Sequence, residues 1–178
     1  NWIKSSSKVS IDLLYNSENK FFVSPLVREK IKLSKLRKKL ANDFWLKRNI
    51  NVLERKHFSF VGSLSNSFDF NFIFDIASLT LVKYPNHKFI ICGTGDRFSE
   101  LSKLFKDLPN VFLFGEVNKY NSGFLLSNSI ATIAPYKNTQ NFRNSIPNKV
   151  IESLENRVPF ITRTQGELEN LIKKYKNG

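Results

Sequence analysis

Five short apolar runs, separated by stretches with helical spacing, constrain this fold more than any other feature of the sequence. The runs cover residues 58–61, 88–92, 111–114, 130–134 and 159–162. Runs of about five residues without polar alternation are typical of strands buried on both faces of a sheet. Strands that alternate with helices favour a parallel sheet, because each parallel pairing needs a crossover connection. We therefore predict one α/β domain built on a doubly wound parallel sheet.

Apolar side chains recur at three- and four-residue steps between these runs and before the first of them. This spacing places them on one face of a helix. The predicted faces are Leu33, Leu36, Leu40 and Phe44 within 26–48, then Phe72, Ile76, Leu79 and Val82, then Phe98, Leu101, Leu104 and Phe105.

The chain is long enough for one domain with an extension. It has 178 residues, of which 41% are hydrophobic and 24% charged, which is a globular composition. We divide it into residues 1–56, a basic and partly helical N-terminal extension or the remnant of a preceding domain, and residues 57–178, the α/β domain. Because the chain opens with Asn1 and has no methionine, we expect a fragment or a processed chain.

The formal net charge is +13, and most of the excess lies in the first third of the chain. The basic residues there include Lys30, Lys32, Lys35, Arg37, Lys38 and Lys39. Such a run forms a solvated helix face, or it contacts an anionic membrane or acceptor. It lacks the interleaved aromatic side chains typical of nucleic-acid binding, so we do not expect nucleic acid as a partner.

Residue counts exclude two further classes. One cysteine, Cys92, cannot form a disulfide framework, and two histidines leave too few ligands for a Cys/His zinc site. The sequence has neither an apolar run of bilayer length nor a recognisable signal peptide. We therefore expect a cytoplasmic protein, with peripheral membrane contact left open.

Glycines follow the first three apolar runs, at the sheet edge where ligands of such folds bind. Gly62 follows the first run, Gly93 and Gly95 follow the second, and Gly115 follows the third. Gly93 and Gly95 match part of the dinucleotide pattern G-x-G-x-x-G, but Phe98 replaces the last glycine, so we do not expect NAD. These glycines permit either a tight turn or the close approach of a ligand to the backbone.

A helix start near residue 147 predicts an anion site. Ser145 can cap a helix whose first turn contains Pro147. The free N–H groups and positive dipole end of such a helix bind phosphate well. Lys149 in this first turn is unfavourable for the dipole, which suggests that it faces an anion. An ordinary capped helix with a surface lysine remains the alternative.

Glu152 lies one turn further along the same predicted helix. Helical geometry directs it away from the side that carries Pro147, Val150 and Leu154, which we expect to pack on the sheet. An ionised carboxylate in that position can accept hydrogen bonds from a ribose diol. The alternative is a glutamate that only faces solvent.

These motifs follow one another in a fixed order: FVG at 60–62, CGTGD at 92–96, FGEV at 114–117, SIPNKVIE at 145–152 and VPFI at 158–161. In this order, residues 57–172 resemble the C-terminal, nucleotide-sugar-binding half of group 1 (family 4) glycosyltransferases of the GT-B type. The resemblance implies a Rossmann-like sheet and a retaining transfer from a nucleotide diphosphate sugar. It also implies that no metal cofactor is essential.

The resemblance assigns roles position by position. Glu152 matches the second glutamate of the family's E-x7-E motif and would hold the ribose. The remaining donor-binding positions are Glu116 and Val117 at the base, Gly62 and Ser63 at the diphosphate, and Ser145, Ile146 and Pro147 at the phosphates or sugar, with Gly93, Gly95 and Lys149 beside them.

The chain departs from the family pattern at two places. Asn144 stands where the first glutamate of the E-x7-E motif is expected. The basic pair that commonly binds the diphosphate after the first strand is replaced by the stretch 65–67, which is Ser-Asn-Ser. Lys149, Arg143 or Lys137 could supply that charge instead. The catalytic residues stay unassigned.

We thus expect the donor domain of a glycosyltransferase that acts on a glycan or lipid-linked acceptor. One alternative is a non-catalytic nucleotide- or membrane-binding module that docks through residues 1–56. Another is a sugar-nucleotide epimerase of the same two-domain architecture. Fold analogy alone does not separate these functions.

Overall fold

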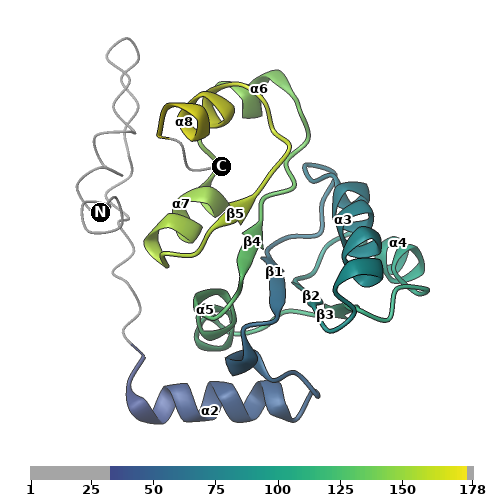
Figure 1. Cartoon of the computed structure of the whole chain (residues 1–178), viewed down its shortest axis with the longest axis vertical. Helices are drawn as coiled ribbons and strands as arrows, with labels where there is room; N and C mark the ends of the chain where they lie inside the picture. Colours follow the sequence, from purple (N-terminus) through teal and green to yellow (C-terminus); the bar gives the residue numbers. More distant parts are fainter. Residues whose placement is uncertain (1–32, 176–178) are drawn as a thin grey trace.

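The five apolar runs form the strands of one parallel sheet, as predicted (Figure 1). The computed structural model describes residues 33–175. The strand order is β3-β2-β1-β4-β5, so the chain starts in the middle, builds one side and then crosses to the other. The strands are β1 (His57–Val61), β2 (Lys88–Cys92), β3 (Val111–Phe114), β4 (Ala131–Ile133) and β5 (Phe160–Ile161).

Helices cover both faces of the sheet, which makes it doubly wound and Rossmann-like. Alternate residues of β2 point to opposite faces, with Phe89 and Ile91 in one apolar cluster and Ile90 and Cys92 in the other. The larger cluster includes side chains from α3 (Phe70–Lys83), α4 (Phe98–Leu104), α7 (Asn148–Glu155) and α8 (Glu167–Tyr175). The smaller one includes side chains from α2 (Lys35–Leu46) and α5 (Lys119–Ser127).

Two short elements complete the described chain. The 3-10 helix η1 (Val52–Glu54) leads from α2 into β1, and α6 (Gln140–Arg143) lies in the long loop before α7.

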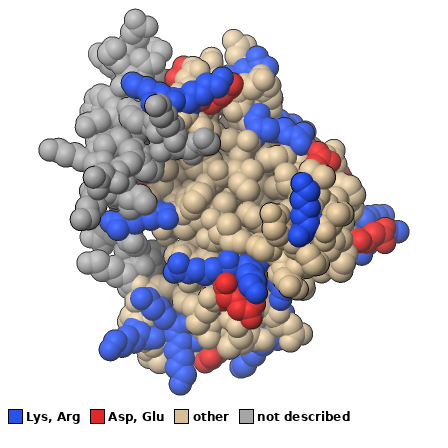
Figure 2. Space-filling view, in the orientation of Figure 1, with Lys and Arg blue, Asp and Glu red and all other residues tan. Residues whose placement is uncertain are grey.

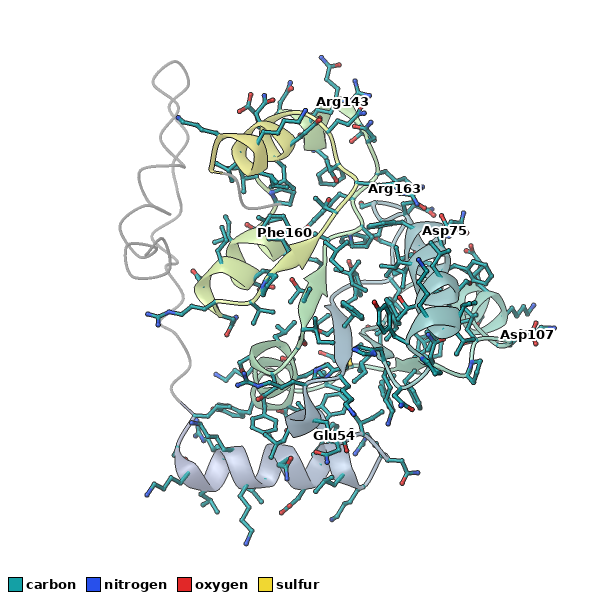
Figure 3. All side chains as sticks on the ribbon, in the orientation of Figure 1. Glu54, Asp75, Asp107, Arg143, Phe160 and Arg163 are labelled. Carbon is teal, nitrogen blue, oxygen red and sulfur yellow. The ribbon has the colours of Figure 1, made fainter. Side chains whose placement is uncertain are left out.

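An ion pair links the segment after β5 to α3. Arg163 bonds Asp75 at 2.9 Å, and the two residues lie next to each other in Figure 3. Every helix between residues 33 and 175 is too short or too polar to cross a membrane.

Two helices form where the spacing predicted them, but each buries only some of the residues that share that spacing. In α2, Leu36 and Leu40 are 66% and 58% exposed, while Ala41 and Trp45 are buried against the sheet. The part of the predicted helix before residue 33 lies outside the described residues. In α3, Phe72 of the predicted face is buried and Ile76 packs on the larger cluster, whereas Leu79 and Val82 are 66% and 84% exposed; the helix also buries Phe70, Ile73 and Ala77.

Basic side chains gather over α2, at the lower edge of the molecule in Figure 2. Lys35, Lys38 and Lys39 are exposed there. The opposite side of the same helix packs on α5 and contributes Trp45 to the smaller apolar cluster. Helix α2 therefore carries part of the basic charge and also belongs to the core packing. The division at residue 57 stays a prediction.

Candidate functional site

The candidate site lies where the strand order reverses, between β1 and β4. Ligands of open α/β sheets bind at such switch points, beyond the carboxyl ends of the strands. A small cavity of about 10 Å³ lies here, roughly the space that one water molecule needs. Its lining comes from β1, β4, α5 and α7: Ser59, Val61, Leu126, Thr132, Ile133, Lys149, Glu152 and Ser153.

The glycine loops after β1 and β2 lie directly against each other. The amide of Gly62 donates to the carbonyl of Cys92 at 2.9 Å, which continues the pairing of the two strands beyond their ends. A Cβ on Gly93 would lie 1.8 Å from the Gly62 carbonyl oxygen, and one on Gly95 would lie 2.5 Å from that of Leu64. Contact between the two loops thus explains Gly93 and Gly95, because backbone atoms fill the space beside them.

Gly62 has a different neighbour. A Cβ built there would lie 2.1 Å from Nζ of Lys149 and 2.8 Å from its Cε. The residue has a φ of 157°, which favours glycine. The space beside this first loop is therefore filled by the end of a flexible side chain from α7. Lys149 therefore occupies the space beside the turn where the resemblance places the diphosphate.

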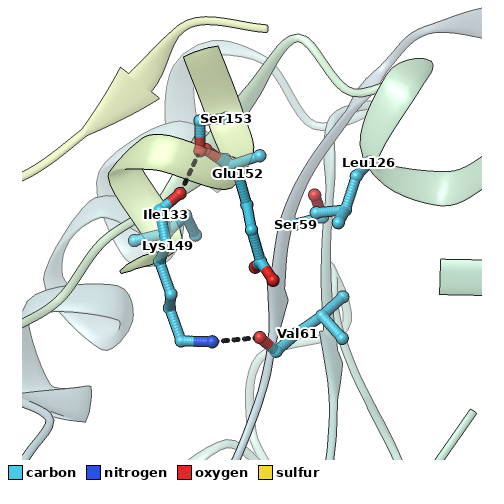
Figure 4. Close-up of a pocket in the computed structure, with 8 residues that line it drawn as sticks. Ser59, Val61, Leu126, Ile133, Lys149, Glu152 and Ser153 are labelled. Atoms are coloured by element: carbon cyan, nitrogen blue, oxygen red, sulfur yellow. Dashed lines mark hydrogen bonds between the residues drawn. The ribbon is translucent and has the colours of Figure 1, made fainter. Parts of the chain in front are cut away.

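Lys149 reaches from the first turn of α7 to the end of β1. Its ammonium donates a hydrogen bond to the carbonyl of Val61, drawn in Figure 4. Nζ also lies 4.8 Å from the ring centre of Phe60 and 5.6 Å from that of Phe68. Burial lowers the pKa of Lys149, while the nearby negative charge of Glu152 acts to raise it. The lysine thus faces the turn where the sequence predicted the diphosphate.

Glu152 extends from α7 toward β1, on the same side as Lys149. In Figure 4 its carboxylate points toward Val61, between Ser59 and the lysine chain, and the residue lines the cavity. On the neighbouring turn of α7, the hydroxyls of Thr132 and Ser153 bond each other at 2.5 Å and fix α7 against β4. The side chain therefore points into the rim of the sheet, as the ribose hypothesis requires. Its role stays a prediction.

The start of α7 differs from the prediction. Pro147 is the N-cap residue itself, and no side chain caps the helix. The Ser145 hydroxyl instead bonds the Asn141 carbonyl at 2.9 Å, because the chain turns out of α6 at that point. Predicting a Ser145 cap for this helix was therefore wrong. Ile146 packs against the larger apolar cluster.

Sequence reasoning missed Tyr136. Its side chain is buried, its ring lies 5.0 Å from that of Phe68, and its hydroxyl lies near the backbone of Lys149. Burial is the main reason that the pKa of Tyr136 rises to about 12. A polar aromatic residue directly after the fourth apolar run was the signal available in the sequence.

The other predicted positions lie along the same edge of the sheet. Ser63 is exposed in the loop after β1, and Glu116 is exposed in the loop after β3. Val117 is half-buried and packs against the smaller apolar cluster. The structure thus brings Gly62, Lys149 and Glu152 together, while Glu116 and Val117 lie two strands away.

Metal binding has no candidate within residues 33–175, where no three His, Cys, Asp or Glu side chains group as a metal site requires. The polar side chains at the candidate site are one ammonium, one carboxylate and the hydroxyls of Ser59, Thr132 and Ser153. Such a set can bind an anion together with a hydroxylated ligand.

Solved structures with a similar fold include glycosyltransferases. S. aureus TarM, a mutant of which was solved with fondaparinux, alpha-GlcNAc-glycerol and UDP, is 19% identical with a TM-score of 0.56 and covers 70% of this chain. The pneumococcal O-GlcNAc transferase GtfA, in complex with UDP and GlcNAc, is 14% identical with a TM-score of 0.51 over 64% of the chain. WaaG, a glycosyltransferase involved in lipopolysaccharide biosynthesis, is 16% identical with a TM-score of 0.54 over 76%.

The chain spans only part of these proteins: 24% of TarM, 22% of GtfA and 36% of WaaG. No curated protein sequence matches it significantly. The family model described as "Glycosyl transferases group 1" matches residues 42–178, which is most of the chain. That match includes every strand of the sheet and the helix that carries Lys149 and Glu152. The chain belongs to the group 1 glycosyl transferase family.

Proposed function

We propose that this chain is the donor-binding domain of a retaining glycosyltransferase, which moves a sugar from a nucleotide diphosphate sugar to a glycan or lipid-linked acceptor. The observation that carries the proposal is the direction of Glu152, whose carboxylate points into the rim at the switch point beside Gly62 (Figure 4). Family membership and the UDP complexes of TarM and GtfA support the same reading.

Each donor group has a proposed contact. Glu152 accepts hydrogen bonds from the ribose diol, because an ionised carboxylate is a strong acceptor. The base lies along the backbone of Glu116 and Val117, at the end of β3. The diphosphate and sugar lie over Gly62 and Ser63 and beside the loop of Ser145, Ile146 and Pro147.

The proposal includes no metal cofactor. We place the enzyme in the cytoplasm, with the basic surface of α2 available for peripheral contact with an anionic membrane. That surface combines Lys35, Lys38 and Lys39 with the exposed Leu36 and Leu40, a composition suited to an anionic interface. It also supports the second candidate, a non-catalytic module that docks on a membrane.

Thermal melting with nucleotide diphosphates tests the donor proposal. A ligand at one hundred times its Kd stabilises the folded state by about 2.7 kcal/mol. We expect UDP or another nucleoside diphosphate to raise the melting temperature of the chain accordingly. Glu152→Gln should weaken binding by about tenfold or more, since hydrogen bonds to a charged group contribute about 1.5–3 kcal/mol.

Glu155→Gln is the matched control, because Glu155 lies on the same helix and does not line the cavity. We expect it to leave the ligand-induced shift unchanged. Equal shifts in the wild type and Glu152→Gln would remove the ribose role. No shift with any nucleoside diphosphate, together with salt-sensitive sedimentation on anionic vesicles, would favour the membrane module.

A further inference from the structure

Lys149 directs its charged end from α7 toward the end of β1. Its ammonium lies against the Val61 carbonyl and over the rings of Phe60 and Phe68, rather than in open solvent. A carbonyl oxygen and two ring faces offset only part of the cost of removing a full charge from water. The lowered pKa of Lys149 reflects that cost, because burial is its main cause. A desolvated cation in a cleft is a candidate functional group.

The stretch that follows β1 carries no positive charge of its own. Residues 63–69 are Ser, Leu, Ser, Asn, Ser, Phe and Asp, without a lysine or arginine. An anion at the Gly62 turn therefore needs a cation from another element. Lys149 supplies one from α7, with Nζ directly beside the Gly62 backbone.

The space beside Gly62 can open, whereas the space beside Gly93 cannot. Backbone atoms of the first loop fill the position next to Gly93, and they are held by the pairing of β1 with β2. The position next to Gly62 is filled by Nζ and Cε of Lys149, the end of a chain with four rotatable bonds. Rotation of that side chain frees the turn without moving the backbone.

We propose that Lys149 is the cation that binds the donor diphosphate, and that in the free protein it rests on the Val61 carbonyl in the space the diphosphate takes. This inference rests on the proposed function. The ammonium exchanges a neutral carbonyl for a phosphate oxygen, which is the stronger partner. The lysine thereby replaces the basic residues that the loop after β1 lacks, and affinity for the phosphates depends on α7.

Direct binding measurements separate this role from donor binding in general. Calorimetry on the wild type and on Lys149→Met gives the Kd for uridine and the Kd for UDP. The ratio of these two Kd values isolates what the phosphates contribute to affinity. The guanosine and adenosine pairs serve as the further probes. We expect the wild type to bind the diphosphate at least tenfold tighter than the nucleoside. Lys149→Met should lose most of that ratio while its Kd for the nucleoside changes less than threefold.

Lys103→Met is the matched control, because Lys103 is an exposed lysine of α4 and does not line the cavity. It should keep the wild-type ratio. If Lys149→Met also keeps that ratio, the proposal is wrong while donor binding stands. If the wild type binds neither nucleosides nor diphosphates, the proposed function fails and this inference fails with it.

Melting without ligand excludes a merely structural lysine. Methionine fits between two phenyl rings and carries no charge to desolvate. Replacing a buried charge with an apolar group of similar size is often neutral or stabilising. We therefore expect Lys149→Met to melt at or above the wild-type temperature. A clear loss of stability would make Lys149 a structural group and overturn the proposal.

Discussion

His57 shows how a single buried side chain joins a strand to a helix. It begins β1, is 2% exposed, and its Nε2 lies 3.2 Å from the Leu125 carbonyl of α5. A carbonyl only accepts, so Nε2 carries the hydrogen. Burial lowers the pKa of His57 below 6.5, with the nearby charge of Lys88 acting in the same direction. The folded protein therefore holds this ring neutral where the unfolded chain binds a proton.

This shift predicts a loss of stability on acidification. Above pH 6.5 the ring is neutral in both states, so its contribution is fully present. Below pH 6.5 the unfolded state takes up a proton first, and stability falls by at most about 1.4 kcal/mol per pH unit. Urea unfolding at pH 7.5, 6.5 and 5.5 gives the free energy of unfolding at each pH. This free energy should change less with pH in His57→Gln than in the wild type. Parallel curves would assign the acid sensitivity to other groups.

At the scale of elements, one aromatic residue holds α2 in place. Trp45 is fully buried, donates its indole N–H to the Asn121 carbonyl of α5 at 3.1 Å, and lies 5.6 Å from the ring of Phe114 on β3. Leu36 and Leu40, which share the helical spacing noted in the sequence, are exposed to solvent. Packing of α2 therefore depends on Trp45 and Ala41.

Substitutions in α2 distinguish the two faces. Trp45→Ala should destabilise the fold by about 3–5 kcal/mol, because it leaves a large cavity and an unpaired carbonyl. Leu40→Ala on the same helix should change stability by less than about 0.5 kcal/mol, since its side chain is mostly exposed. Chemical denaturation gives both values. A larger loss for Leu40→Ala would restore the face that the leucine spacing predicted.

At the scale of the whole molecule, the site occupies one rim and faces away from the core. The chain spans 24% of TarM and 36% of WaaG, so other parts of such proteins lie beyond what this chain includes. Acceptor contacts and exclusion of water commonly depend on closure of a second domain over the first. Donor binding and transfer are therefore separable properties.

The 178-residue chain alone should bind a nucleoside diphosphate and transfer no sugar. The physical reason is that one wall of the cleft cannot position an acceptor or exclude water from the reacting sugar. Incubation with UDP-linked sugars and candidate acceptors, followed by mass spectrometry, checks this. Transfer by the chain alone would show that the acceptor site lies within these residues.

The sequence by itself determined the sheet. Strands β2 and β3 begin and end where the apolar runs do, because a strand that has helices packed on both faces is apolar at nearly every position. It did not determine which face of α3 is buried, because Phe, Ile, Leu and Val surround that helix on most sides. The choice there is made by the shape of the sheet that the helix covers.

For the site, the sequence determined which residue types stand at the strand ends and on α7. Only the tertiary structure decided that Lys149 meets Val61, a residue 88 positions earlier, and that the buried ring of Tyr136 packs on Phe68. Those contacts arise because the chain crosses from β3 to β4 and returns α7 over the end of β1. No local pattern encodes the direction of a long side chain across that gap.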